Sequence, residues 1–205
     1  MNYQLFAAFL FITLILVLTP GPIVTLVIAT GATQGTRAAL VTVAGTTIGN
    51  AILVTTIAAG LGFVLQYAAI LFEVLRVVGA AYLIWLGIQA WRGASRMQAG
   101  APEPERRVHF RRGLVVALSN PKTIAFFTAF LPQFVDPTLP AGQQLAVMCT
   151  VAIIMAGCTD AGWAIAAGAG RAWFMKPARV KLLGRLSGLA LIGGGVWLSL
   201  ARRPS

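Results

Sequence analysis

The sequence predicts an all-α integral membrane protein. Of its 205 residues, 58% are hydrophobic and 10% are charged, whereas soluble domains carry roughly 25% charged residues. The apolar residues gather in six runs, each reaching the length of about 20 residues that a membrane-spanning helix needs. The runs cover residues 5–28, 38–63, 67–91, 113–135, 145–170 and 182–201. Because they occupy most of the chain, we expect residues 1–205 to form a single transmembrane domain.

The basic residues predict how the spans are oriented. If all six runs cross the membrane, segments 29–37, 92–112 and 171–185 lie on the same side of it. These segments hold the basic residues Arg37, Arg92, Arg96, Arg106, Arg107, Arg111, Arg112, Arg171, Lys176, Arg179, Lys181 and Arg185. The positive-inside rule therefore places the three segments in the cytoplasm and both termini outside. Arg202 and Arg203 depart from the rule and leave a five-span arrangement open.

A proline-rich motif interrupts the first run. No Lys or Arg precedes Arg37, so the run lacks the positive region of a cleaved signal peptide and is expected to be retained. Within it, Thr19-Pro20-Gly21-Pro22 removes two backbone donors and frees carbonyl groups of the preceding turn. Freed carbonyls inside a membrane need a partner, and a polar substrate can supply one.

Small residues characterise the second run. Gly45 and Gly49 are four residues apart, a spacing that lets two helices approach closely, either within the chain or in a homodimer. Asn50 lies deep in the same run. Its amide needs a partner there, which a neighbouring helix or a bound ligand can provide.

The polar segment 92–112 divides the chain into two halves. It follows Trp91, which is placed as an interfacial anchor, and it contains the single histidine of the sequence, His109, which we expect to be solvated in a loop. Three runs lie on either side of the segment. Because three is an odd number, the second half enters the membrane in the opposite orientation. Residues 1–91 and 113–205 are therefore predicted to be two inverted three-helix repeats.

A second break lies in the fourth run, at Ser119-Asn120-Pro121-Lys122. Pro121 removes a backbone hydrogen bond, and a charged Lys122 costs roughly 2.5–3.5 kcal/mol in hydrocarbon. Such a break is tolerated only where protein or water satisfies the freed groups. Broken spans in corresponding positions of two repeats mark the substrate site of a transporter. We therefore expect the breaks of the first and fourth spans to meet near the membrane midplane.

The fifth run carries Asp160, which is the carboxylate that lies deep in a predicted span. An ionisable group in this position indicates a functional site, and we interpret Asp160 as a proton-coupling residue that also has the option of an ion pair with Lys122. Cys149 and Cys158 lie nine residues apart on the same run, on opposite faces of a helix, so they are not expected to pair. The sixth run is short and rich in glycine, and we expect it to serve packing.

These motifs together resemble the LysE/RhtB family of bacterial amino-acid exporters. The matching segments are Thr19-Pro20-Gly21-Pro22, Gly79-Ala80-Ala81-Tyr82-Leu83, the stretch from Asn120-Pro121-Lys122 to Leu131-Pro132-Gln133-Phe134, and Asp160-x-x-Trp163. The resemblance covers nearly the whole chain. It implies an inner-membrane exporter of amino acids or related metabolites that is driven by the proton gradient. The residues that it implicates are Pro20, Gly21, Pro22, Asn120, Pro121, Lys122 and Asp160.

The resulting hypothesis is a secondary-active exporter that holds a zwitterionic amino acid between the two breaks. Lys122 and freed amides face the carboxylate of the cargo, whereas Asp160 and carbonyls near Pro20 face its ammonium group. Asn50 is a further candidate for substrate binding. Proton exchange at Asp160 couples efflux to the gradient.

Several other classes of protein fit the sequence less well. The net charge of +11 follows from the topology of the basic segments rather than from nucleic-acid binding. No nucleophile–base pair, cofactor motif or cysteine pair indicates an enzyme or a thiol–disulfide carrier. A divalent-cation exporter needs several oxygen ligands, and Asp160 beside Lys122 is a poor metal site. A membrane scaffold that transports nothing stays open as an alternative. The expected partners are a small-molecule substrate, protons and membrane lipid, with a homodimer as an option.

Overall fold

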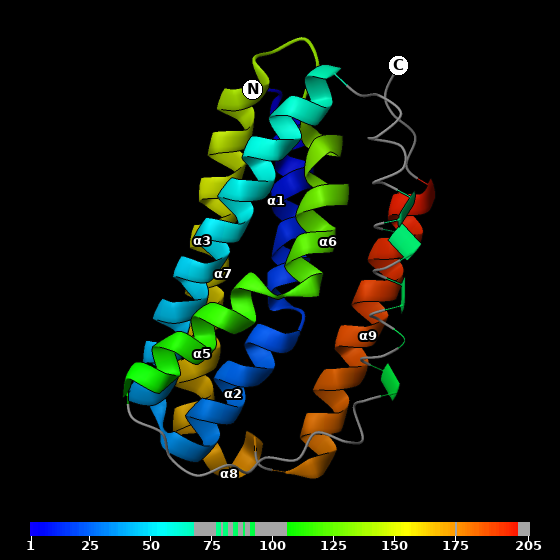
Figure 1. Ribbon diagram of the computed structural model, residues 1–205. Helices are drawn as coiled ribbons and strands as arrows, with labels where there is room; N and C mark the ends of the chain where they lie inside the picture. The colour runs from blue at the N-terminus through cyan, green and yellow to red at the C-terminus, as the bar shows by residue number, and fades with distance from the viewer. Residues whose placement is uncertain are drawn as a thin grey trace.

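The computed structural model is a bundle of helices (Figure 1). It describes residues 1–67, 77–78, 80–81, 84–85, 88, 91–92, 106–174 and 176–200. Most of the third predicted span, including Gly79, Tyr82 and Leu83, lies outside the described residues, as does segment 93–105. The elements are α1 (Tyr3–Leu18), α2 (Pro22–Gln34), α3 (Thr36–Tyr67), α5 (Arg106–Leu118), α6 (Pro121–Ala129), the 3₁₀ helix η1 (Leu131–Phe134), α7 (Ala141–Ala169), α8 (Arg171–Phe174) and α9 (Pro177–Leu200).

Three of the predicted spans are present as helices long and apolar enough to cross a membrane, namely Thr36–Leu61, Val108–Phe134 and Ala141–Ala169. α1 and α2 pass the same test only as a bent pair, which has the form of a broken span or a re-entrant loop. The sixth run lies in α9, a continuous helix of 24 residues. The described residues thus agree with an all-α membrane protein, while the arrangement as two inverted three-helix repeats stays a prediction.

The two breaks occur where the prolines predict them. α1 ends at Leu18 and α2 begins at Pro22, with a bend of 44° between them. α5 ends at Leu118 and α6 begins at Pro121. Both prolines occupy the first helical position, where the missing N–H has no intrahelical partner to lose. Figure 1 shows the two junctions at a similar level, between the two ends of the bundle.

The segments that carry most of the basic residues of the described chain lie at one end of the bundle. Figure 1 places the α2–α3 junction, the start of α5 and α8 at the same end, and the loop before α7 at the other. Arg171 in α8 closes the basic end, since its Nε donates to the carbonyl of Ala32 and its Nη2 to that of Thr33, each at 2.6 Å. A cation at these carbonyls caps the C-terminus of α2 and offsets its dipole.

Glycines bring α3 and α5 into close contact at the basic end. A Cβ at Gly45 would lie 2.1 Å from the carbonyl oxygen of Phe110, and one at Gly49 would lie 2.7 Å from the Cβ of Ala117. Across the interface, a Cβ at Gly113 would lie 2.3 Å from the carbonyl oxygen of Thr42. Of the two roles predicted for Gly45 and Gly49, the structure therefore shows internal packing, and a homodimer stays a prediction.

The prediction that His109 lies in a solvated loop is wrong. α5 begins at Arg106, and His109 is only 6% exposed. The physical reason is the close approach of α3, because the backbone of the neighbouring Phe110 lies against Gly45. This contact buries His109, whereas Val108, Arg111 and Arg112 on the same helix stay exposed.

Among three hydrophobic clusters of the described residues, the two larger ones occupy different parts of the bundle. One is rich in aromatic side chains from α1, α6 and η1, and the ring of Phe9 meets that of Phe134 edge-on at 5.6 Å between centroids, while Phe126 stacks on Phe130 at 5.0 Å. The other joins α2, α3, α5 and α7 through smaller residues, and it comprises Ile23, Val27, Ala39, Val43, Ala117 and Ala164. Along the sequence, the first break separates Phe9 of the aromatic core from Ile23 of the other core, and the second break separates Ala117 from Phe126.

A polar cluster ties α1 to the loop before α7. Asn2 Nδ2 donates to Asp136 Oδ2 at 3.1 Å, and Thr138 donates to Asp136 Oδ1 from its hydroxyl at 2.6 Å and from its backbone N–H at 2.9 Å. Gln144, which is buried, closes the loop by accepting from the N–H of Asp136 and donating to its carbonyl, each at 3.0 Å. The hydrogen bonds from Thr138, followed by that from Asn2, hold the pKa of the Asp136 carboxyl below its usual range.

The glycine contact predicts opposite outcomes for one substitution at two places on α3. Gly45→Ala places a methyl group against the backbone of α5, and overpacking of this kind costs about 1–3 kcal/mol. Gly60→Ala is the matched control, because no atom of the described residues lies within 4 Å of a Cβ at Gly60 and alanine favours a helix more than glycine does. We expect the thermal midpoint of the purified protein in detergent to fall for Gly45→Ala and to hold or rise for Gly60→Ala. Equal midpoints for the two variants would contradict the close contact.

The lowered pKa of Asp136 predicts a pH-dependent contribution to stability. A carboxyl with a lowered folded-state pKa stabilises the protein above its ordinary pKa of about 3.9 and loses this effect as the pH falls through the folded-state value. We expect Asp136→Ala to lower the thermal midpoint at pH 7, and we expect the gap from the unsubstituted protein to close in strong acid. A gap of the same size at both pH values would rule out the charge of Asp136 as its cause.

Candidate functional site

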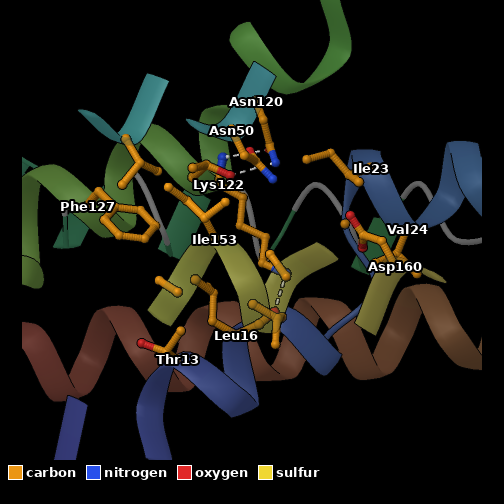
Figure 2. A pocket seen from close by; sticks show the side chains of 16 residues that line it. Thr13, Leu16, Ile23, Val24, Asn50, Asn120, Lys122, Phe127, Ile153 and Asp160 are labelled. Atoms are coloured by element: carbon orange, nitrogen blue, oxygen red, sulfur yellow. Dashed lines mark hydrogen bonds between the residues drawn. The ribbon is translucent and has the colours of Figure 1, made fainter. Parts of the chain in front are cut away.

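Both helix breaks border one cavity inside the bundle (Figure 2). Its volume is about 50 Å³, room for a few water molecules at roughly 10–15 Å³ each. The apolar part of the lining consists of Leu16, Val17, Ile23, Val24, Val54, Phe127, Ala152, Ile153 and Ala156. The remaining lining residues are Thr13, Gly21, Asn50, Asn120, Lys122, Thr123 and Asp160. Five of the eight predicted site residues, Gly21, Asn50, Asn120, Lys122 and Asp160, thus meet in one place, although they come from three different helices and two helix junctions.

The ammonium group of Lys122 binds the break in the first span. Its Nζ donates to the carbonyl of Leu16 at 2.6 Å and to that of Thr19 at 2.5 Å, and the side chain is only 7% exposed. In a continuous helix the carbonyl of Leu16 would accept from the N–H of residue 20, but proline has no N–H. The lysine of the fourth span therefore replaces a hydrogen bond that Pro20 removes from the first.

Gly21 gives the lysine its path to those carbonyls. A Cβ at Gly21 would lie 3.0 Å from Cδ and 3.5 Å from Nζ of Lys122. Any larger residue would push the lysine stem away from the end of α1. The glycine between the two prolines is thus explained by a close approach to a side chain from the other half of the chain.

Asn120 directs Lys122 by capping α6. Its Oδ1 accepts from the backbone N–H of Lys122 at 3.2 Å, and its Nδ2 donates to the hydroxyl of Thr123 at 2.8 Å. An asparagine cap followed by Pro121 at the first helical position fixes where α6 begins. Pro20, Pro22 and Pro121 do not line the cavity. They act on the backbone at the breaks, and their predicted part in substrate binding stays a prediction.

Asp160 reaches the same cavity from α7. Its side chain is 4% exposed, and its Oδ2 lies 3.4 Å from the hydroxyl of Thr46 on α3. The hydrogen bonds of the Lys122 ammonium go to Leu16 and Thr19 rather than to this carboxylate. Figure 2 shows Asp160 beside Ile23 and Val24, with Lys122 between it and Thr13. The described lining therefore carries one acidic and one basic side chain at separate positions.

Two buried oxygens in the lining have no hydrogen-bond partner among the described residues. They are Oγ1 of Thr13 and Oδ1 of Asn50, whose side chains are 0% and 6% exposed. Leaving a buried polar group unpaired costs about 1–3 kcal/mol. Atoms of this kind beside a cavity are available to a ligand or to water.

Asn50 was predicted from the sequence, and Thr13 was not. The signal for Thr13 was nevertheless present, because it is the one polar side chain between residues 5 and 18. The sequence does not reveal which face of the first helix turns inward, since almost every residue around Thr13 is apolar. Asn50 gives a stronger signal in the sequence than Thr13 does, because a buried amide has two polar atoms that need partners.

Comparison with known proteins gives a consistent picture. A family model described as LysE type translocator matches residues 14–202. A homoserine/homoserine lactone efflux protein of Salmonella typhi is 34% identical over 204 residues, which cover 98% of this chain and 99% of that protein. A leucine efflux protein of Enterobacter sp. (strain 638) is 37% identical over 125 residues, which cover 59% of each chain. No solved structure matches the chain.

The unpaired hydroxyl of Thr13 predicts that its removal does not destabilise the protein. Thr13→Val replaces a buried, unpartnered hydroxyl with a methyl group of similar size, so we expect the thermal midpoint to hold or rise. Thr46→Val is the matched control, because Thr46 is also 0% exposed but its hydroxyl lies within reach of Asp160 and of the Val43 carbonyl. Loss of a hydrogen bond to a charged group costs about 1.5–3 kcal/mol. Equal destabilisation by both variants would show that Thr13 has a partner after all.

Proposed function

The chain belongs to the LysE type translocators, and from this we propose that it exports a small amino acid or a closely related metabolite across the bacterial inner membrane by proton-coupled secondary transport. The observation that carries the proposal is the placement of Lys122 and Asp160, one base and one acid, in a single buried cavity that both helix breaks border. Charged groups inside a membrane bundle are costly and mark transport pathways.

The two charges match the two ends of a zwitterion. An ammonium group has three donors, and two of those of Lys122 are occupied by the carbonyls of Leu16 and Thr19. The third donor and the positive charge face the cargo carboxylate. Asp160 accepts the cargo ammonium group when it is ionised and releases it when it is protonated. Proton exchange at Asp160 then couples release of the cargo to the gradient.

The unpartnered oxygens of Thr13 and Asn50 favour a cargo with a hydrogen-bond donor in its side chain. Oδ1 of an asparagine only accepts, so the hydroxyl of an amino acid satisfies it and an aliphatic side chain does not. The Salmonella relative is named for homoserine, which carries such a hydroxyl, and the Enterobacter relative for leucine, which does not. We therefore favour a small hydroxyl-bearing amino acid over leucine as the cargo.

The size of the cavity implies a contracted conformation. About 50 Å³ is well below the roughly 300–1,000 Å³ of a pocket for a larger organic ligand. The helices around the breaks part to admit the cargo and close around it. The basic end of the bundle faces the cytoplasm, and the six spans form two inverted repeats about the cavity.

Asp160→Asn is expected to abolish efflux that depends on a pH gradient. The amide cannot exchange a proton, so cargo and proton movement become uncoupled. The measurement is efflux of labelled amino acid from vesicles with an imposed pH gradient, with the amount of inserted protein determined in parallel. Asp136→Asn is the matched control, since the same change at a loop position outside the cavity leaves efflux in place.

Normal gradient-driven efflux by Asp160→Asn would overturn the coupling role. The cargo itself is identified by profiling metabolites in the medium of cells that produce the unsubstituted protein or Asp160→Asn. Enrichment of a hydroxyl-bearing amino acid with the unsubstituted protein alone supports the proposal. Export of a divalent cation such as manganese instead, or of no solute, would favour the ion-exporter or scaffold alternatives.

A further inference from the structure

We propose that the carbonyls of Leu16 and Thr19 form a monovalent-cation site at the end of α1, and that the Lys122 ammonium is its tethered occupant. The inference deepens the proposed function, because it gives Lys122 the place that a separate coupling cation would otherwise take. The test of the cation site does not depend on transport.

Pro20 and the extended backbone at Thr19 leave the two carbonyls without a helical donor four residues further along the chain. Pro20 lacks the N–H that would complete the helical hydrogen bond of Leu16, whose carbonyl is left with the N–H of Thr19 at 3.2 Å. Thr19 is extended, with ψ of 119°, so its carbonyl leaves the helical path. The C-terminal end of a helix also carries a partial negative charge. Carbonyls at the ends of broken helices are the groups that hold monovalent cations in other membrane transporters.

The occupant has the properties of a bound cation. Nζ donates to both carbonyl oxygens, at 2.6 and 2.5 Å, and its positive charge strengthens both hydrogen bonds. The lysine stem passes against Gly21 with little spare space. Because the ammonium is attached to α6 and its ligands belong to α1, the cation links the two broken spans mechanically.

Asp160 provides the competing partner. Among the described residues that line the cavity, α1, α2 and α3 contribute no titratable group, α6 contributes Lys122 itself, and α7 contributes Asp160. An ionised Asp160 attracts the ammonium away from α1, and a protonated Asp160 leaves it there. Lys122 thus transmits the protonation state of Asp160 on α7 to the hinge between α1 and α2.

Lys122→Ala vacates the site and allows a free cation to enter it. We expect the thermal midpoint of this purified variant to rise saturably with sodium or methylammonium chloride, by about 5 °C in large excess. N-methylglucamine chloride at the same ionic strength, a cation too large for the site, is expected to have no such effect. The unsubstituted protein should respond equally to all three salts, because its site is already occupied.

Two further variants identify the carbonyls as the ligands. Lys122→Met fills the space with an uncharged chain, so no cation response is expected. Lys122→Ala with Pro20→Ala restores an N–H to the carbonyl of Leu16, so the response to small cations should fall. If Lys122→Ala folds in none of the salts but the double variant folds, the carbonyl of Leu16 needs a hydrogen-bond donor and holds no free cation, which would overturn the cation site.

Failure of the cation site is distinguishable from failure of the export proposal. Identical midpoints of Lys122→Ala in sodium, methylammonium and N-methylglucamine salts would overturn the cation site, and so would failure of both the single and the double variant to fold. Neither result bears on efflux by the unsubstituted protein or on its loss in Asp160→Asn. Conversely, normal efflux by Asp160→Asn would leave a saturable cation response of Lys122→Ala intact.

Discussion

The structure depends on one hydrogen bond that Pro20 cannot make. The carbonyl of Leu16 loses the donor that residue 20 would supply in a continuous helix, and hydrocarbon offers no replacement. Lys122 supplies the donor from more than one hundred residues further along the chain. The same contact provides the buried ammonium of Lys122 with oxygen acceptors. The unpaired carbonyl and the buried ammonium would each be costly alone, and each satisfies the other. The first and fourth spans are joined at their breaks as a result.

Packing divides the bundle around this contact into two parts with different mechanical properties. At the basic end, glycines hold α3 close to α5. A Cβ at Gly31 would lie 3.0 Å from the Cβ of Ala167, so α2 and α7 also approach closely. Arg171 fastens the end of α2 to the same region. At the other end, α1, α6 and η1 share an aromatic core. The breaks separate a backbone-to-backbone interface from one made of side chains, which is a suitable place for a hinge.

The positions of the breaks were predictable from the sequence, but their partners were not. Proline and glycine act locally, so Thr19-Pro20-Gly21-Pro22 and Asn120-Pro121 show where helices end without any knowledge of the fold. Lys122 was expected to face a cargo carboxylate, and its two carbonyl ligands became visible only when the spans were placed side by side. The inward position of Thr13 and the burial of His109 were not predicted, for a related reason. Which face of a helix is buried depends on its neighbours, and an almost uniformly apolar or polar stretch of sequence does not specify that face.

The cavity contains polar groups that tighter packing alone would remove. Among the described residues, the oxygens of Thr13 and Asn50 have no hydrogen-bond partner, and the ionisable side chains of Lys122 and Asp160 are buried, although apolar residues of similar volume would fit such positions at lower cost. A ligand that pairs with these groups stabilises the closed arrangement more than an open one, where water already satisfies them. That difference in affinity between two conformations is what allows a ligand to shift their populations. For the export that we propose, the polar groups of the cavity supply such a difference in affinity.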